Sequence, residues 1–235
     1  MQEFFEATRL AFALAFSGDA DLIEIILLSL RVSLTAMLVA CILGFPLGAL
    51  LAISRFTGRG PVLVIINALM GLPPVVVGLI VYLHLSRAGP MGSFGLLYTP
   101  TAMIIAQIIL IMPIIAALSR QVIEDLHNEY AEQFRSFSVP RFKAVRALIW
   151  DGRYSLLTVA LAGFGRAIAE VGAVIIVGGN IDHLTRVMTT AIALETSKGD
   201  LPLALALGFV LLFLALAVNA AVMSLRITTG RISNV

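Results

Sequence analysis

Charged residues are scarce in this sequence: Asp, Glu, Lys and Arg make up 13% of its 235 residues. In soluble proteins about a quarter of the residues are charged and roughly half are apolar. Here 60% of the residues are hydrophobic and the mean hydropathy is +1.01. These values exclude an ordinary soluble domain and indicate an all-α membrane protein, because the apolar runs have the length of membrane-crossing helices. The net charge of +2 gives no sign of nucleic-acid binding.

Several residue patterns that carry chemistry are missing from the sequence. The single cysteine, Cys41, cannot form a disulfide within the chain. There is no GxxxxGKS or GxxxxGKT motif, so the chain cannot cradle the phosphates of ATP itself. HExxH and GxSxG motifs are also absent, and the three histidines, His84, His127 and His183, are far apart in the sequence. We therefore expect no catalytic residue, no metal and no bound cofactor. A membrane enzyme is an alternative, but the sequence offers no set of residues that could form its catalytic site.

Five apolar runs are long enough to cross a bilayer, since a helical crossing takes about 20 residues. They lie near residues 22–53, 61–86, 97–119, 154–178 and 201–226. We expect a single transmembrane domain over residues 1–235, with about five spans. The N-terminal segment, residues 1–20, is predicted either as an amphipathic helix at the membrane surface or as a frayed end.

Positive charges divide unequally between the two sets of loops that these spans create. One set holds ten Lys and Arg residues and the opposite set holds four, while Arg31 and Arg166 lie within the runs. Cytoplasmic loops carry the excess of Lys and Arg in membrane proteins. The set with ten, which includes residues 120–153, is therefore predicted to be cytoplasmic, with the N-terminus outside and the C-terminus inside.

Two opposite charges, Arg166 and Glu170, lie within the fourth apolar run. They are four residues apart and share one face of a helix. A charge near the bilayer centre costs about 2.5–3.5 kcal/mol on insertion scales, and pairing lowers that cost. The pair either ties this span to its neighbours or lines a translocation path, where Arg166 supplies positive potential and Glu170 prevents tight trapping of an anion. Gly172 follows closely and allows another helix to pack near the pair.

Two other runs contain residues that alter helix geometry. Pro73 and Pro74 remove backbone donors in the second run and predict a kink, which either lines a cavity or is a simple bend. Gly44 and Gly48 in the first run form a small-xxx-small pattern, which allows close helix approach and is a candidate dimer contact.

The stretch 178–190 lies on the outer side in the predicted topology. Its candidate contact residues are Asn180, Thr185 and Arg186, which offer hydrogen-bond donors. They would contact an anion or a docking protein, or they belong to an ordinary polar loop.

The cytoplasmic segment 120–153 is divided by Pro140, because proline forbids a continuous unstrained helix. A short helix is predicted before this break. Phe134 and Phe137 would anchor it in a groove of a soluble partner, or would dip into the lipid interface. After the break, residues 141–150 mix cationic and apolar side chains, which is typical of an interfacial helix.

The stretch "EYAEQFRSFSVPRFKAV" resembles the coupling segment of ABC-importer permeases. Glu129 and Ala131 keep a Glu-x-Ala form of that family's Glu-Ala-Ala opening, and Ser138 stands at the position of its glycine. The stretches "LAGFGRAIAEVGAVIIVGGNI" and "TRVMTTAIALETSKGDLPLALALG" are similar to the tungstate-type branch of oxyanion importer permeases, which are relatives of the molybdate permeases. The similarity extends from about residue 20 to residue 226.

The resemblance implies an ABC type I importer-like permease for a tetrahedral oxyanion, with tungstate as the first expectation and molybdate or another anion as alternatives. It also implies a homodimer in a prokaryotic inner membrane, two cytoplasmic ATPase subunits that use ATP, and an extracytoplasmic oxyanion-binding protein. The expected contacts to the ATPase are Glu129, Ala131, Phe134, Phe137 and Ser138. A secondary transporter or channel, with Glu170 as a proton-coupling or selectivity residue, is the alternative of a different class.

Overall fold

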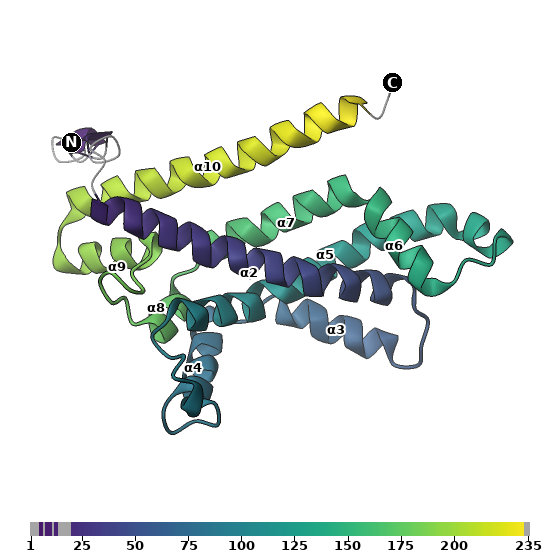
Figure 1. Cartoon of the computed structure of the whole chain (residues 1–235), viewed down its shortest axis with the longest axis horizontal. Coiled ribbons are helices and arrows are strands. Elements are labelled where there is room, and N and C mark those ends of the chain that lie inside the picture. Colours follow the sequence, from purple (N-terminus) through teal and green to yellow (C-terminus); the bar gives the residue numbers. More distant parts are fainter. Residues whose placement is uncertain (1–4, 7, 11, 14–19, 233–235) are drawn as a thin grey trace.

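The computed structural model describes residues 5, 6, 8–10, 12, 13 and 20–232, and over these residues the protein contains helices and no strand (Figure 1). The helices are α2 (Ala20–Ile53), α3 (Arg59–Leu69), α4 (Pro74–Leu85), η1 (Gly92–Phe94), α5 (Pro100–Ser136), α6 (Arg141–Asp151), α7 (Arg153–Ile168), α8 (Gly172–Gly178), α9 (Met188–Lys198) and α10 (Leu201–Ile232). The predicted all-α class is confirmed. The predicted interfacial segment, residues 1–20, lies largely outside the described residues.

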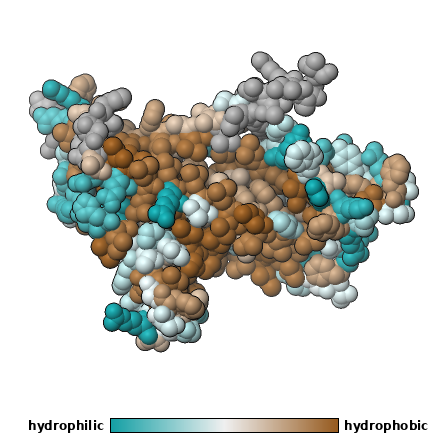
Figure 2. All heavy atoms as spheres, viewed as in Figure 1, coloured by the Kyte–Doolittle hydropathy of each residue, from teal (hydrophilic) through white to brown (hydrophobic). Residues whose placement is uncertain are grey.

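Three helices, α2, α5 and α10, are each long and apolar enough to cross a membrane alone. Two further crossings arise when each of two bent pairs is counted as one span: α3 with α4, bent by 97°, and α7 with α8, bent by 58°. The five predicted runs therefore correspond to three long helices and two bent pairs. Figure 2 shows hydrophobic residues across the middle of the molecule and hydrophilic residues at both ends, as expected for a protein that crosses a bilayer.

The third run continues further than the sequence predicts. α5 is one helix of 37 residues, so the short helix expected before Pro140 is its C-terminal part and not a separate element. No glycine or proline occurs between residues 114 and 136, and so nothing in the local sequence ends the helix at the membrane surface. Pro113 lies inside α5 without interrupting it.

The core is built on α2 and α5, which run side by side in the same direction (Figure 1). A Cβ atom at Gly48 would lie 2.6 Å from the carbonyl oxygen of Ala116, and one at Gly44 would lie 2.8 Å from Cγ2 of Ile115. These two glycines therefore allow α2 to pack closely on α5 of the same chain. The interpretation of Gly44 and Gly48 as a dimer contact is wrong, because both are buried inside the chain.

The two ends of the molecule carry different elements. The loop 179–187 and α9 lie at the end where α2 begins, whereas the turns 54–58 and 137–140 and α6 lie at the opposite end (Figure 1). α4 projects away from the long axis, and α10 diverges from the other helices towards its C-terminal end. Adjacent loops along the chain therefore alternate between the ends, as a multi-pass protein requires.

Candidate functional site

The second span is broken between α3 and α4. Pro73 stands before α4 in an extended conformation, and Pro74 is the first residue of the helix. Proline suits the first helical position because its missing N–H has no helical partner there. The sequence predicts a kink at this place, and the structure shows a stronger change of direction, the bend of 97°.

The fourth span is also broken, and Glu170 lies in the break. α7 ends at Ile168 and α8 begins at Gly172, so Arg166 and Glu170 do not share one continuous helix as predicted. Their ion pair nevertheless forms, from Nη1 of Arg166 to Oε2 of Glu170. The second carboxylate oxygen of Glu170 accepts a hydrogen bond from the backbone N–H of Ala173 at 3.1 Å. The side chain therefore satisfies a backbone N–H in the first turn of α8.

Burial differs strongly between the two charged residues. Glu170 is 4% exposed, whereas the side chain of Arg166 is 35% exposed. A buried carboxylate is tolerated when it is paired and hydrogen-bonded, and both conditions are met. The partly exposed guanidinium leaves a positive group at the surface of the site.

The two breaks lie next to each other. A Cβ atom at Gly172 would lie 3.0 Å from Cγ2 of Val75 in the first turn of α4, and one at Gly78 would lie 2.8 Å from Cα of Ala173. The first turns of α4 and α8 therefore pack in direct contact. The structure thus brings together the predicted residues Pro73, Pro74, Glu170 and Gly172, with Arg166 joined through its ion pair.

Polar residues from three other helices lie beside the break in the fourth span, and Gln107, Ser29 and Ser33 among them are not predicted from the sequence. Nε2 of Gln107 donates to the carbonyl oxygen of Ala167 at 3.0 Å. Oγ1 of Thr189 donates to the carbonyl oxygen of Glu170 at 2.9 Å. Ser29, Ser33, Gln107 and Thr189 line a cavity of about 10 Å³ beside Glu170, and Oε1 of Gln107 is buried there without a partner among the described residues. A lone amide in an otherwise apolar run is the signal that could have identified Gln107.

The three candidate residues of the loop 179–187 differ in their environment. Thr185 is fully buried, and its hydroxyl donates to the carbonyl oxygen of Gly178 at 2.6 Å and accepts from the N–H of Ile181 at 2.9 Å. Arg186 pairs with Asp182 at 2.7 Å. Asn180 has a positive φ of 51° and donates to the carbonyl oxygen of Thr190 at 3.4 Å. Thr185 therefore holds the loop in shape, which leaves Asn180 and Arg186 closer to the surface.

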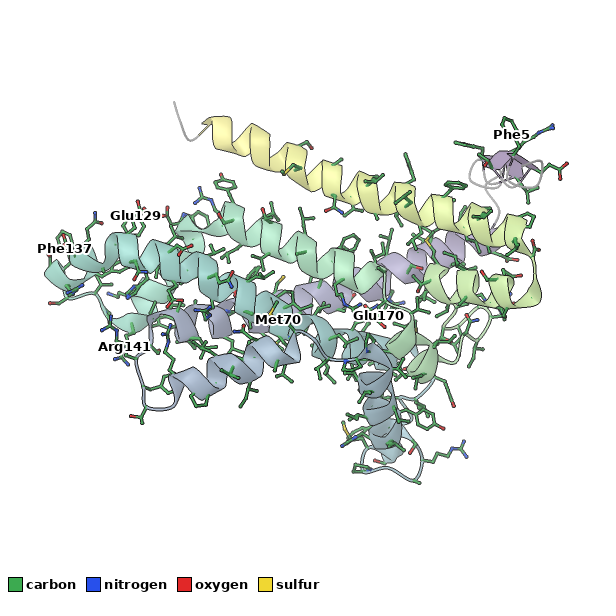
Figure 3. All side chains as sticks on the ribbon, turned by 180° about the vertical axis from the view of Figure 1, so that it is seen from behind. Phe5, Met70, Glu129, Phe137, Arg141 and Glu170 are labelled. Carbon is green, nitrogen blue, oxygen red and sulfur yellow. The ribbon has the colours of Figure 1, made fainter. Side chains whose placement is uncertain are left out.

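The turn after α5 separates the two predicted phenylalanine anchors. Phe137 is 80% exposed, whereas Phe134 packs against His127 and Tyr130, with ring centroids 6.1 Å apart in each case. Glu129 is exposed and Ala131 is half-buried. Figure 3 shows Glu129 and Phe137 at the far end of the molecule from Glu170.

Ser138 adopts the backbone conformation that favours glycine, with φ at 49°. The N–H of Ser138 donates to the carbonyl oxygen of Arg135, and the N–H of Val139 donates to that of Phe134. These bonds form a Schellman motif, in which the left-handed position is most often glycine. The geometry agrees with the placement of Ser138 where the resemblance expects glycine.

Comparison with known proteins adds the following findings. Residues 44–226 match the family model described as "binding-protein-dependent transport system inner membrane component". The chain is 41% identical over 226 residues to the tungstate uptake system permease protein TupB of Peptoclostridium acidaminophilum, covering 96% of this chain and 99% of that protein. It is 39% identical to a probable anion ABC transporter permease protein of Haloferax volcanii, covering 89% and 92%. It is 38% identical to TupB of Campylobacter jejuni, covering 92% and 90%.

Proposed function

The chain belongs to the family of inner membrane components of binding-protein-dependent transport systems, and on this premise we propose that the anion it carries is tungstate. Membership makes the chain a multi-pass permease subunit of an ABC importer, which works with an ATPase and a binding protein. The subunit is not itself catalytic, and ATP is used by the partner ATPase.

One observation carries the choice of substrate. Two of the most similar relatives are tungstate permeases, and the identity of 41% to the first extends over 99% of that protein. Molybdate is the alternative, because its size and charge are nearly those of tungstate and a transient path discriminates weakly between them. Selection between the two oxyanions then belongs to the binding protein.

The adjoining breaks of the second and fourth spans are the proposed translocation path or gate. Helix N-termini carry partial positive charge, and transporters commonly point the ends of broken helices at an anionic substrate. α4 and α8 begin side by side, and Arg166 adds a partly exposed cation. Glu170 balances this charge, so that an anion is attracted without being held. Pro73, Pro74 and Gly172 shape the path.

The path is proposed to lie between two copies of the chain. Over the described residues a single chain forms five spans if each bent pair is counted as one, an odd number that gives no second half to enclose a path. The exposed hydrophobic residues of α4, among them Val75, Val76 and Leu79, are available to face a second copy or lipid. A homodimer would place two sets of breaks around one axis.

The end of the molecule with the turn 137–140 is proposed to be cytoplasmic, with the N-terminus outside. The segment 120–153 then forms the coupling segment, in which Phe137, Glu129 and Ala131 contact the ATPase while Phe134 and Ser138 support the turn. At the outer end, Asn180 and Arg186 contact the binding protein or the anion, and Thr185 supports their loop.

The test is ATP-dependent uptake by the reconstituted transporter. The permease, its ATPase and its binding protein are assembled in proteoliposomes, and tungstate uptake is followed with molybdate or sulfate as competitor. Competition by molybdate but not by sulfate is expected. If the transporter takes up another anion but not tungstate, the proposed substrate is wrong. If uptake does not require ATP and depends on protonation of Glu170, the result supports a secondary transporter instead.

Co-purification tests the coupling segment separately. The tagged permease is expressed with its ATPase, solubilised in mild detergent and compared with the Phe137→Ala variant. Weaker retention of the ATPase by the variant is expected, because an exposed aromatic anchor is lost. Equal retention by the two proteins excludes Phe137 as an anchor.

A further inference from the structure

The exposed face of α6 combines large apolar side chains with positive charge. Phe142 and Trp150 are 79% and 72% exposed, and Arg146 lies between them at a spacing of four residues on the same helix face. The opposite face packs into the protein through Ala144, Val145 and Leu148. Exposed aromatic rings beside cations are typical of the interface between a bilayer and water.

This face borders a groove of about 840 Å³. Its lining includes Pro46, Phe142, Lys143, Arg146, Trp150 and Arg153. No acidic residue belongs to the lining, and neither Lys143 nor Arg146 forms an ion pair within the described part of the chain. Asp151, the one acid of α6, accepts a hydrogen bond from the hydroxyl of Tyr130 at 2.9 Å. The groove is therefore cationic and apolar, and suited to a ligand with an anionic head and a hydrocarbon body.

The groove extends along a membrane span. Pro46 lies seven residues before the end of α2 at Ile53, which is about 10 Å along the helix axis. A soluble ATPase docks at the polar end of the protein and does not reach this depth, whereas the acyl chain of a lipid does. The position of Pro46 therefore favours a lipid over a soluble partner.

Arg153 is already fixed at one edge of the groove. Its Nη1 donates to the carbonyl oxygen of Trp150 at 2.8 Å, and its guanidinium lies over the rings of Trp150 and Tyr154, 5.0 and 4.5 Å from their centroids. Lys143 and Arg146 remain as the unpaired cations that a phosphate can contact.

We propose that the groove between α2 and α6 binds an acidic phospholipid, with the headgroup phosphate at Lys143 and Arg146 and an acyl chain running along Pro46 and Trp150. This role goes beyond anion transport and does not depend on the identity of the transported anion. A bound lipid covers the exposed face of α6 and fixes the second half of the coupling segment at the membrane surface.

The test measures lipid retention by the complete permease–ATPase complex. The complex is delipidated in detergent, titrated with phosphatidylglycerol or phosphatidylcholine, and examined by native mass spectrometry. Retention of phosphatidylglycerol over phosphatidylcholine is expected. Lys143→Gln and Arg146→Gln should each weaken phosphatidylglycerol binding about fivefold, the effect of one basic residue near an anionic lipid, and the double variant should weaken it further.

Arg141→Gln is the matched control, because Arg141 is an exposed cation of the same helix that does not line the groove (Figure 3). It should retain phosphatidylglycerol as the unchanged protein does. Equal retention of the two lipids overturns the proposal, as does unchanged retention by the double variant. Loss of the ATPase from the double variant with lipid retention intact also overturns it, since the groove is then a protein contact. All four variants carry substitutions at exposed positions only, so monodispersity and the thermal midpoint verify folding.

Discussion

Glu170 connects three parts of the protein through single atoms. Its two carboxylate oxygens contact Arg166 of α7 and the N–H of Ala173 in α8, and its carbonyl oxygen accepts from Thr189 of α9. Removing one partner of a buried pair leaves an unbalanced charge. The exposed part of Arg166 lessens this penalty, because that guanidinium can remain in contact with water.

The Glu170→Gln variant should assemble with the ATPase but transport less. The amide oxygen can still accept from the N–H of Ala173, whereas the negative charge that balances Arg166 is lost. The site would then bind an anion too tightly to release it. Tungstate uptake and ATPase retention are measured together. Normal uptake excludes a role in the gate.

The double variant Arg166→Gln with Glu170→Gln separates path lining from a structural pair. If the pair only ties helices together, removing both charges restores most of the function lost in Glu170→Gln. If Arg166 attracts the anion, uptake stays low in the double variant. Thermal unfolding of the three proteins provides the stability reference.

At position 138, glycine should stabilise the protein more than the serine that is present. A non-glycine residue in the left-handed conformation costs roughly 1 kcal/mol, and glycine removes that cost. Ser138→Gly is therefore expected to raise the thermal midpoint slightly, and Ser138→Val to lower it, because a β-branched residue fits this conformation poorly. Equal thermal midpoints for the glycine and valine variants would contradict the claim that the backbone at residue 138 is strained.

Phe134 and Phe137 illustrate what the sequence could and could not predict at single residues. Both are phenylalanines before Pro140, and the spacing alone makes them equivalent. In the structure, Phe134 lies on the same face of α5 as His127 and Tyr130 and packs against a buried cluster that includes Leu148 of α6. Phe137 follows the last residue of α5 and is exposed. We expect Phe134→Ala to cost about 1–3 kcal/mol of stability and Phe137→Ala less than about 0.5 kcal/mol, measured by thermal unfolding in detergent.

At the level of helices, the difference between continuous and broken spans determines the site. The break in the second span follows from Pro73 and Pro74, and the sequence predicts its position. The break in the fourth span has no such signal, because Val171, Gly172 and Ala173 are ordinary in a membrane helix. It depends on long-range contacts from Gln107 and Thr189, which no local pattern reveals. For the same reason α9, which begins inside the predicted outer stretch, was not foreseen as a helix.

The contact between α4 and α8 should be sensitive to a single methyl group. In Gly78→Ala, the new Cβ would lie 2.8 Å from a backbone atom of Ala173, so one of the two helices must shift. The expected loss of stability is about 1–3 kcal/mol, with reduced transport.

The control is Gly208→Ala in α10, where no heavy atom of the described residues, apart from the backbone of the same helix, lies within 4 Å of the added Cβ. This substitution should be neutral, or stabilising by up to about 1 kcal/mol, because glycine is less favourable than alanine inside a helix. Similar thermal midpoints for Gly78→Ala and Gly208→Ala would show that α4 and α8 are loosely packed.

On the scale of the whole molecule, a contact between His183 and Glu24 joins the start of α2 to the loop 179–187. His183 Nδ1 lies 2.9 Å from Oε2 of Glu24, and the hydrogen bond to Glu24 is the main cause that raises the pKa of His183, with Asp182 contributing. A raised pKa means that the folded protein binds the proton more tightly than the unfolded chain. The stabilisation is therefore complete below the ordinary histidine pKa of about 6.5 and is lost as the pH rises through the raised value.

The difference in thermal midpoint between the unchanged protein and His183→Gln should follow this dependence. It is expected to be positive in acid and to vanish at higher pH, because neutral His183 has lost its charge attraction to Glu24. Glu24→Gln should remove most of the pH dependence. A difference that is constant across the pH range would contradict the assignment to this pair.

The length of α5 has a mechanical consequence. At 1.5 Å per residue its 37 residues form a strut of about 55 Å, which carries the exposed turn at its C-terminal end and Gln107 in its N-terminal half. An unbroken helix is stiff along its axis, whereas the interrupted backbones at residues 70–73 and 169–171 are compliant. A displacement applied at Phe137 would be carried along α5 to Gln107 and the carbonyl of Ala167, and would deform the bundle most where the backbone is interrupted. Those joints are the two breaks that surround Glu170.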